Sequence, residues 1–356
     1  MYLISKASLI SIMPRIMYGV SPIGLGHATR TAAIVQELLA AEIEVRLFSG
    51  GVAADFLKAC GFIVDDIVAY PTLDVVDGEM KRTALWYLRS WDALRKTKSR
   101  TEKLFRQFRP DAVVCDEEFS GVTLACRQDC ESLFVADELE LGFARGRVAH
   151  LIEGRVDRWY KSLLRSVNYL VVPDFGANRG NERHVGPIVR QVTKSREEVR
   201  TEYRIPLDSN LILFSMSGSG VGSFLLQRVI EATQGNKRKN VTIVVSGNRG
   251  NRISEEGILD LGTVMENQNL VAAADLVVST AGKSIEDEAA SVGTPFIGIP
   301  ILHHAEQERN AASLGYSYSD RERIGELIKV KMGKREVPRK YRGAEEAATL
   351  ISSVLD

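Results

Sequence analysis

Short apolar segments alternate with segments of helical periodicity along most of this sequence, and this alternation restricts the possible folds more than any other feature. In the first half, the strand-like segments are 15–20, 43–50, 62–68, 111–117, 132–138 and 168–174. Helical patterns separate most of them, among others at 52–60, 83–108, 119–128 and 148–166. Strands and helices in alternation form βαβ units, so we expect an α/β fold with a parallel sheet.

A polar segment at 186–210, which contains Pro187 and Pro206, interrupts this pattern before a second α/β series begins. The strand-like segments of that series are 210–220, 240–247, 258–264, 274–280 and 295–300, with helical patterns at 222–234, 283–292 and 305–314. The sequence therefore predicts two Rossmann-like, doubly wound domains, at 1–190 and 210–340, joined by a linker at 191–209 and followed by a C-terminal helix within 341–356. Two such sheets would present the loops at their carboxyl ends to one cleft.

Composition excludes several classes of function. The 46 Lys and Arg residues equal the 46 Asp and Glu residues, so no overall positive field is available for nucleic acid, and we expect no such partner. The four cysteines form no CxxC pair, which favours free thiols in a reducing cytoplasm over a zinc site. No apolar run reaches membrane-spanning length, and 1–14 lacks the cleavage site of a secretory signal, so we interpret it as an N-terminal extension.

The loop that follows the first strand carries a histidine at a position suited to chemistry. Gly24 and Gly26 precede His27 directly, and a helix with Arg30 on its polar side follows. A dinucleotide-binding loop would have a third glycine where Thr29 stands, so the loop is not of that type. His27 could act as a proton acceptor near neutral pH, or it could simply cap the helix.

The second half contains two more glycine-rich turns between a strand and a helix. They lie at 215–223 and 279–300, and each offers backbone N–H groups and hydroxyls to an anion. Two such turns at the mouth of one sheet fit a diphosphate. A polar cluster at 303–307, with His303, His304, Glu306 and Gln307, begins the next helix and is suited to binding sugar hydroxyls, although a charged helix N-terminus has the same appearance.

These motifs, in this order, resemble those of nucleotide-sugar glycosyltransferases of the GT-B fold, particularly the family that includes the lipid II-forming peptidoglycan N-acetylglucosaminyltransferase. The likeness is carried by GLGHATR at 24–30, by GPIVR at 186–190 and by the segment 271–315. Within that segment the matching positions are Ala281-Gly282, Glu288, Gly293-Thr294-Pro295, Glu306-Gln307 and Asn310-Ala311. The resemblance covers both domains and is specific for fold and donor class.

The resemblance implies roles for individual residues. Glu288 would accept hydrogen bonds from the donor ribose, and Gln307, with Glu306 and His304, would hold the donor sugar. The remaining residues assigned to the donor nucleotide and its diphosphate are Gly26, Arg30, Gly218, Ser219, Gly220, Ser246, Val264, Thr280, Ala281, Gly282, Lys283 and Ser284. Lys283 and Ser284 depart from the commoner residues of the family. The donor is a substrate, commonly a uridine nucleotide, and no cofactor is implied.

The mechanism that this resemblance implies is inverting and independent of metal. The chain has no Asp-x-Asp motif, and Thr280 stands where retaining relatives usually have a second glutamate. An inverting enzyme needs a base for the acceptor hydroxyl, and His27, oriented by Asp116, is the candidate. Two alternatives stay open at this point. Asp116 could be the N-cap of the helix at 119–128, or Asp116 itself could be the base and His27 a positioning group.

The acceptor leaves weaker traces in the sequence. The segment 95–109 is strongly basic, and 150–166 combines basic residues with an apolar face, which would suit a lipid-linked acceptor at the cytoplasmic face of a membrane. Solvated helix surfaces have the same composition. Two other functions share the architecture: a non-hydrolysing nucleotide-sugar 2-epimerase, and a sugar-nucleotide-binding protein without turnover.

Overall fold

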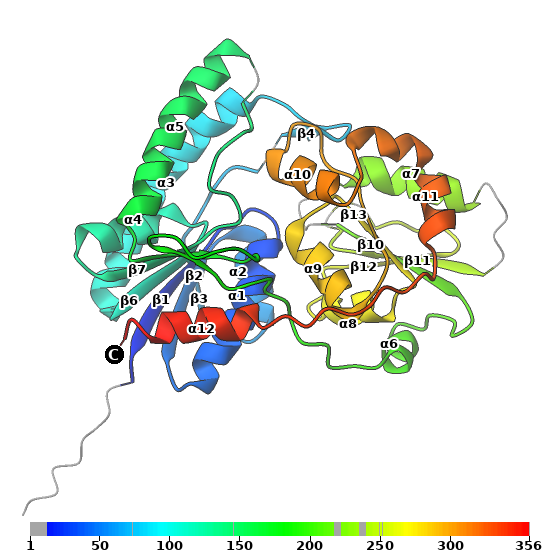
Figure 1. The fold of residues 1–356 in the computed structure, drawn as a ribbon, viewed down its shortest axis with the longest axis horizontal. Helices are drawn as coiled ribbons and strands as arrows, with labels where there is room; N and C mark the ends of the chain where they lie inside the picture. Colours follow the sequence, from blue (N-terminus) through cyan, green and yellow to red (C-terminus); the bar gives the residue numbers. More distant parts are fainter. Residues whose placement is uncertain are drawn as a thin grey trace, which may run out of the picture.

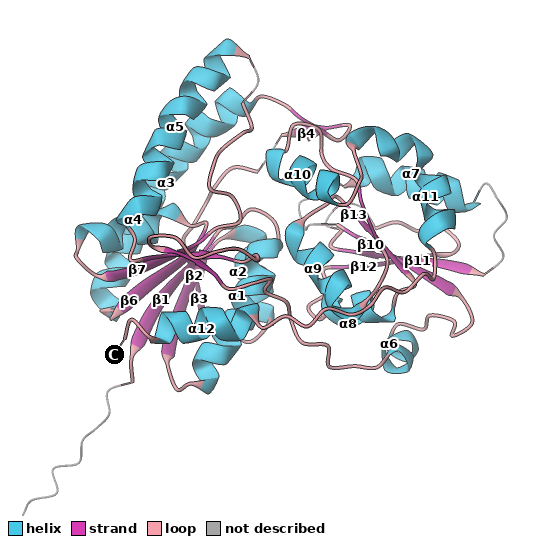
Figure 2. Cartoon of the chain, in the orientation of Figure 1, coloured by secondary structure: helices cyan, strands magenta, loops and turns pink. Residues whose placement is uncertain are grey.

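The computed structural model describes residues 13–72, 74–144, 146–216, 222–234, 240–248, 250 and 252–355. Two α/β domains face one another, each built on a parallel sheet (Figure 1). Helices lie on the faces of both sheets (Figure 2). The predicted architecture of two doubly wound domains is therefore confirmed.

The N-terminal domain contains a seven-stranded sheet in the order β3-β2-β1-β6-β7-β8-β9, with all neighbours parallel. Its strands are β1 Arg15–Val20, β2 Glu44–Ser49, β3 Val64–Asp66, β6 Ala112–Asp116, β7 Glu131–Val135, β8 Tyr169–Val172 and β9 Glu182–His184. The central strands are buried on both faces, which explains their continuous apolar sequence. The strand order reverses between β1 and β6, and a ligand crevice is expected at that point.

Two apolar cores cover the two faces of this sheet. On one face lie α1 Gly26–Ala40 and α2 Gly51–Ala59, and on the other lie α3 Thr83–Phe108, α4 Phe119–Arg127 and α5 Arg147–Ser166. In α1 the residues Ala32, Ile34 and Val35 are buried. The prediction that Arg30 lies on the polar side of α1 is wrong, because its side chain is only 3% exposed.

The C-terminal domain contains a five-stranded parallel sheet in the order β12-β11-β10-β13-β14. Its strands are β10 Asn210–Ser215, β11 Val241–Ser246, β12 Ile258–Gly262, β13 Leu276–Ser279 and β14 Phe296–Gly298. The helical elements are α6 Arg196–Glu202, α7 Ser223–Gln234, α8 Asn267–Ala273, α9 Lys283–Val292, α10 Ala305–Ser313, the 3₁₀ helix Tyr318–Arg323 and α11 Ile324–Lys331. None of the helices in the described ranges combines the length and apolar composition needed to cross a bilayer.

A hairpin that the sequence analysis did not predict extends from the N-terminal domain to the other domain. It consists of β4 Val75–Val76 and β5 Glu79–Met80. Leu302, in the loop before α10, donates its N–H to the carbonyl of Gly78 and accepts from the N–H of Met80, at 2.8 and 3.1 Å. Tyr318 donates its hydroxyl to the carbonyl of Asp77 at 2.7 Å. The hairpin therefore joins the two domains at the loop that precedes α10.

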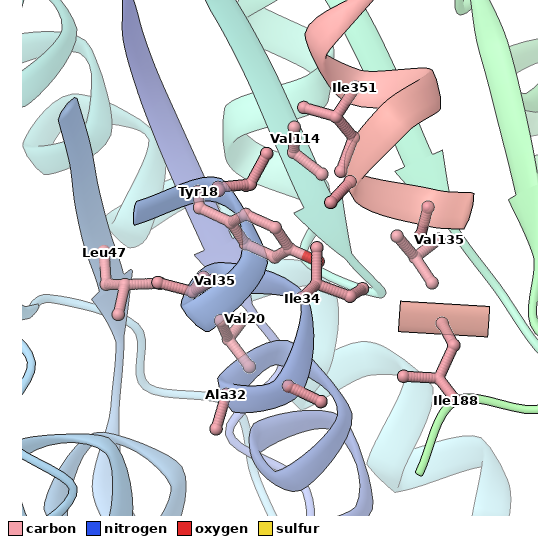
Figure 3. Close-up of a cluster of buried hydrophobic side chains, with 14 of the residues drawn as sticks. Tyr18, Val20, Ala32, Ile34, Val35, Leu47, Val114, Val135, Ile188 and Ile351 are labelled. Carbon is pink, nitrogen blue, oxygen red and sulfur yellow. The ribbon is translucent and has the colours of Figure 1, made fainter. Parts of the chain in front are cut away.

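The chain returns to the N-terminal domain at its end. The helix α12, Gly343–Ser352, packs against α1, and Ile351 lies in the same buried cluster as Val114, Val135 and Ile188 (Figure 3). Gly343 lies where a Cβ atom would come within 2.4 Å of the carbonyl oxygens of Gly186 and Pro187. The two segments that connect the domains therefore lie in contact, and the last helix completes the core of the first domain.

Candidate active site

His27 lies at the carboxyl edge of the first sheet and points its ring toward acidic side chains. It is the second residue of α1, whose N-cap is Leu25, so His27 does not cap the helix. Gly24, with a φ of 74°, provides the left-handed backbone conformation of the loop before it. The Nδ1 atom of His27 is 2.8 Å from Oδ1 of Asp116, and Nε2 is 3.6 Å from Oε2 of Glu117. The loop thus forms a histidine–carboxylate pair.

Arg30, one helical turn beyond His27, holds this pair in place. Its Nε and Nη2 atoms donate to the two oxygens of Asp116 at 2.6 and 2.5 Å, and Nη1 donates to Asp137, which follows β7. Because the guanidinium is buried and fully engaged with these carboxylates, it is a fixed positive charge beneath the site. Its assigned role in donor binding stays a prediction.

Asp116 is not the N-cap of α4. That position belongs to Glu118, whose carboxylate accepts from the N–H groups of Ser120 and Gly121 at 2.9 and 2.8 Å. Asp116, at the end of β6, is completely buried and directed at His27 and Arg30. Of the two interpretations of this residue, the structure contradicts the capping one.

The charges around His27 change its proton affinity. Burial alone would lower the pKa of His27, but Glu117 and the hydrogen bond to Asp116 outweigh this effect and raise it to about 9. Burial acts to raise the pKa of Asp116, yet Arg30 and His27 hold it below its usual value. Burial raises the pKa of Glu117 above the ordinary range. His27 is therefore mostly protonated at neutral pH, and Asp116 is ionised.

Residues of the second domain contact the first domain next to this site. Ser284, at the start of α9, lies with its Oγ 3.5 Å from the carbonyl of Gly26. Arg309 of α10 donates through Nε to Glu138 at 3.1 Å. Burial and the neighbouring carboxylates of Asp137 and Glu117 raise the pKa of Glu306 to about 8. The His27 cluster thus faces both α9 and α10 of the second domain.

Among the residues assigned to the donor nucleotide, several have a protein partner. Both oxygens of Glu288 accept from Arg190, and the ammonium of Lys283 donates to Asp287 of the same helix. Thr280 and Ala281 are buried at the end of β13, Gly282 is the N-cap of α9, and Ala281 has a left-handed φ of 48°. Ser246 is buried with its hydroxyl 3.5 Å from that of Ser215, and Val264 is half-buried after β12. Gly218, Ser219 and Gly220 lie outside the described residues.

The residues assigned to the donor sugar lie at the N-terminus of α10. His304 is the N-cap, and its Nδ1 accepts from the N–H of Gln307 at 3.5 Å, while burial lowers its pKa to about 4. The side-chain oxygen of Gln307 accepts from the N–H of Ile301 at 3.0 Å. Glu306 interacts electrostatically with His27, whose positive charge acts to lower the pKa of Glu306. These roles in sugar binding stay predictions.

One set of side chains has the chemistry of a cation site. His27, Glu117 and Asp137 offer ligand atoms that all lie within 4.8 Å of one another. However, Arg30 donates to Asp137, and Nδ1 of His27 is 3.0 Å from the same guanidinium. A fixed positive charge at this position opposes a second cation, so the donor set fits a metal poorly.

The sequence analysis assigned no role in sugar transfer to three residues that contribute to the site. Glu117 follows Asp116 at the end of β6, Asp137 follows β7, and Arg190 ends the GPIVR segment. Asp137 could have been found, because it occupies the carboxyl end of the strand next to β6. The pairing of Arg190 with Glu288 spans 98 positions and leaves no local signal.

Comparisons with known proteins show which proteins this chain resembles. Residues 14–140 match the family model of glycosyl transferase family 1, and residues 225–320 match that of the glycosyltransferase family 28 C-terminal domain. An uncharacterized glycosyltransferase of Methanosarcina acetivorans is 25% identical over 319 residues, which cover 84% of this chain and 82% of the relative. The chain is a GT-B glycosyltransferase.

This glycosyltransferase is also similar to a solved structure and, over part of its length, to a named bacterial enzyme. The structure of the spinosyn rhamnosyltransferase SpnG complexed with spinosyn aglycone superposes with a TM-score of 0.62 at 16% identity, covering 96% of both chains. The UDP-N-acetylglucosamine–N-acetylmuramyl-(pentapeptide) pyrophosphoryl-undecaprenol N-acetylglucosamine transferase of Paenarthrobacter aurescens is 25% identical over 164 residues, 42% of this chain and 44% of that enzyme. The predicted fold and enzyme class are therefore confirmed.

Proposed function

We propose that this glycosyltransferase transfers a sugar from a nucleoside-diphosphate sugar, with uridine as the base, to an acceptor hydroxyl, with inversion at the anomeric carbon. The observation that carries the proposal is the His27–Asp116 pair, which lies on the first domain and faces the start of α9 on the second. The uridine assignment draws support from the name of the Paenarthrobacter relative. Such a placement would bring an acceptor hydroxyl and a donor sugar together between the two sheets.

In this proposal His27 is the base and Asp116 the positioning group. With Nδ1–H donating to Asp116, Nε2 is the nitrogen that accepts the proton of the acceptor hydroxyl. The hydroxyl oxygen then forms the new bond to the anomeric carbon while the bond to the diphosphate breaks on the opposite face. Asp116 stabilises the imidazolium, and because it is completely buried, it is less suited than the 17% exposed His27 to contact an acceptor.

The diphosphate leaving group requires positive potential, which we assign to the N-terminus of α9. The N-cap Gly282 makes no side-chain hydrogen bond to the helix, so the first N–H groups remain for an anion. Ser284 adds a hydroxyl at the same end. We propose that no metal ion takes part, since Arg30 occupies the position where the carboxylates could otherwise bind one. Activity that survives EDTA and does not rise on adding Mg²⁺ or Mn²⁺ would support this assignment.

The experiment that tests the function combines labelled UDP-sugars with nucleotide analysis. We expect wild-type protein to form free UDP from the UDP-sugar, by transfer or by slow hydrolysis. His27→Ala should bind UDP with unchanged affinity but should form UDP from the UDP-sugar at least about 100-fold more slowly. A sugar altered at carbon 2 and still attached to its nucleotide would instead identify an epimerase, for which the carboxyl groups of Glu117, Asp137 and Glu306 would supply an acid and a base. Binding without any conversion would identify a sensor.

We further propose that the acceptor is lipid-linked and that the tips of α3 and α5 contact the cytoplasmic face of a membrane. The two helices pack together and project beyond the sheet (Figure 1). Leu88, Trp91, Val148 and Leu151 on these helices are 51–67% exposed. Exposed basic residues near these four in the sequence are Arg89, Arg147, Arg155 and Arg158. Exposed apolar side chains together with exposed arginines on the same helices favour an anionic lipid surface.

Vesicle sedimentation tests the membrane contact. Wild-type protein should sediment with vesicles that contain phosphatidylglycerol and stay in solution with phosphatidylcholine vesicles. The variant Trp91→Glu/Leu151→Glu should lose this binding. Val337→Glu, at an 86% exposed position in the segment before α12, is the matched control and should sediment as the wild type does. Equal sedimentation of all three proteins would refute the contact.

A further inference from the structure

The hairpin formed by β4 and β5 has a turn that its own sequence specifies. Asp77 and Gly78 form a two-residue loop between the paired positions Val76 and Glu79, and their φ angles are 49° and 74°. A two-residue turn of type I′ requires positive φ at both positions, and Asp-Gly is one of the sequences that favour it most. The hairpin therefore has a preformed shape, which holds the carbonyl groups of the turn in fixed directions.

Three separate segments of the second domain contact this hairpin. Leu302 forms an isolated parallel β-bridge with Glu79, so that both its N–H and its carbonyl group are paired with the hairpin. The hydroxyl of Tyr318 donates to a carbonyl of the turn at 2.7 Å. The ring of Phe224, on α7, lies so close to Gly78 that a Cβ atom there would come within 2.8 Å of it. The contact is therefore specific in both hydrogen bonding and shape.

The hairpin contact and the connecting segments lie at opposite ends of the domain boundary. In Figure 1 β4 meets the loop before α10 at the top of the view, whereas the two segments that connect the domains cross at the bottom, beside α8 and α12. The domains are thus joined covalently at one end and by the hairpin at the other. A rotation about the connecting segments would separate the hairpin from Leu302.

Between these two ends the domains touch at the proposed diphosphate position. Oγ of Ser284, at the start of α9, lies 3.5 Å from the carbonyl of Gly26. An anion lies about 2.9 Å from each group that binds it, so a phosphate group does not fit between two atoms that are 3.5 Å apart. Farther along the boundary, the ring of Phe143 packs on that of His304 with the ring centroids 5.3 Å apart. Binding of a diphosphate at the start of α9 therefore requires the domains to move apart.

We propose that the hairpin at 75–80 is a latch that holds the two domains closed, and that it must release Leu302 and Tyr318 before the donor nucleotide binds. This inference rests on the proposed function, because it takes the N-terminus of α9 as the diphosphate site. Since only the open form then binds the nucleotide, the observed association rate is proportional to the open fraction. A weaker latch therefore speeds binding, and a permanently closed latch prevents it.

The first test weakens the latch. Tyr318→Phe removes the hydrogen bond to the turn and keeps the ring. Stopped-flow measurement with UDP, or with GDP or ADP if the wild type prefers one of these, should show association about 2- to 10-fold faster than in the wild type, the value of one hydrogen bond. Tyr316→Phe is the matched control, because the Tyr316 hydroxyl also donates to a backbone carbonyl, that of Phe296 at 3.2 Å, but within the second domain. Its association rate should equal that of the wild type.

The second test closes the latch covalently. Glu79 and Leu302 are partners in a β-bridge, and partners on neighbouring strands lie at a separation that a disulfide spans. The variant Glu79→Cys/Leu302→Cys should form this disulfide on oxidation, as checked by peptide mapping, and should then bind the nucleotide at least about 100-fold more weakly until dithiothreitol restores binding. The control Val76→Cys/Glu79→Cys places its disulfide within the hairpin and should bind the nucleotide equally in both redox states.

The outcomes separate the latch from the proposed function. Normal nucleotide binding by the oxidised Glu79→Cys/Leu302→Cys variant, or failure of its disulfide to form, would overturn the latch and leave the proposed function intact. An association rate in Tyr318→Phe no higher than that in Tyr316→Phe would do the same. Failure of the wild type to bind UDP, GDP and ADP would overturn the proposed function itself.

Discussion

Removing the charge of Glu117 should make the enzyme more active near neutral pH, although Glu117 lies in the active site. A base must be neutral to accept a proton, and with a pKa of about 9 only about 1% of His27 is neutral at pH 7. Glu117 lies 3.6 Å from Nε2 of His27 and is the main group that raises this pKa. The substitution Glu117→Gln keeps the shape of the side chain and removes its charge.

The size of the effect follows from this distance. Two unit charges 3.6 Å apart interact by about 1 kcal/mol in a water-like medium and by about 4–5 kcal/mol at an effective dielectric constant of about 20. Because Glu117 is 27% exposed, the weaker limit applies, and the pKa of His27 should fall from about 9 to about 8. The neutral fraction at pH 7 then rises roughly tenfold, and kcat/KM at that pH rises by the same factor.

The assay is UDP release from a UDP-sugar, measured as kcat/KM from pH 6 to pH 10, because this parameter reports the ionisation of the free enzyme. The wild-type rate should rise with pH and level off above about 9, and the Glu117→Gln rate should level off about one pH unit lower. Glu138→Gln is the control, since Glu138 pairs with Arg309 and should leave the profile unchanged. An unchanged profile in Glu117→Gln, or a uniform loss of rate at all pH values, would refute the role of His27 as base.

Three further predictions concern the His27–Asp116 pair and the last helix, α12. Asp116→Asn should lower the rate of UDP release about 10²- to 10⁴-fold at unchanged UDP affinity, measured by stopped assay and titration; a loss below tenfold would contradict the orienting role. Because the folded-state pKa of His27 lies above its unfolded value of 6.5, the protonated ring stabilises the fold fully below about pH 6.5, and this stabilisation of about 3 kcal/mol disappears as pH rises through about 9. Urea unfolding at pH 6 and pH 10 should show this loss in the wild type and not in His27→Gln. Ile351→Ala should lower the free energy of unfolding by about 2–4 kcal/mol, whereas Thr349→Ala on the exposed side of α12 should change it by less than about 0.5 kcal/mol in the same experiment.

The sequence predicted most strands and helices of both domains because their signals are local, but it did not predict the edge strand β9 or the helices α6, α8 and α11. The helix at 83–108 agrees with α3 at both ends, and the helix at 283–292 agrees with α9. The segment 62–68 yields only the three residues Val64–Asp66 as a strand, because it pairs at the edge of the sheet with β2 alone. The hairpin at 75–80 was missed because its strands are two residues long and are held by Leu302 of the other domain.

The candidate site could be predicted only in part, because some of its contacts join segments that are far apart in the sequence. His27 follows the buried strand β1 and Asp116 is the last residue of the buried strand β6, so both could be placed at one sheet edge from their positions in the sequence. The interactions of Arg30 could not be predicted, because an arginine on a helix is normally solvated. This arginine is buried and makes three hydrogen bonds to two carboxylates, those of Asp116 at the end of β6 and Asp137 after β7. The ion pair of Arg190 depends entirely on how the linker crosses α9.

The return of α12 to the first domain has a consequence for biosynthesis. A ribosome delivers the chain from the N-terminus, so all strands of the first sheet have been made long before Ile351, which completes their apolar cover. Until the last residues emerge, the groove beside α1 exposes Ile34, Val135 and Ile188 to water. The second domain must therefore be synthesised while the first still lacks part of its core, and a chain that stops before 343 leaves that surface open to chaperones and proteases.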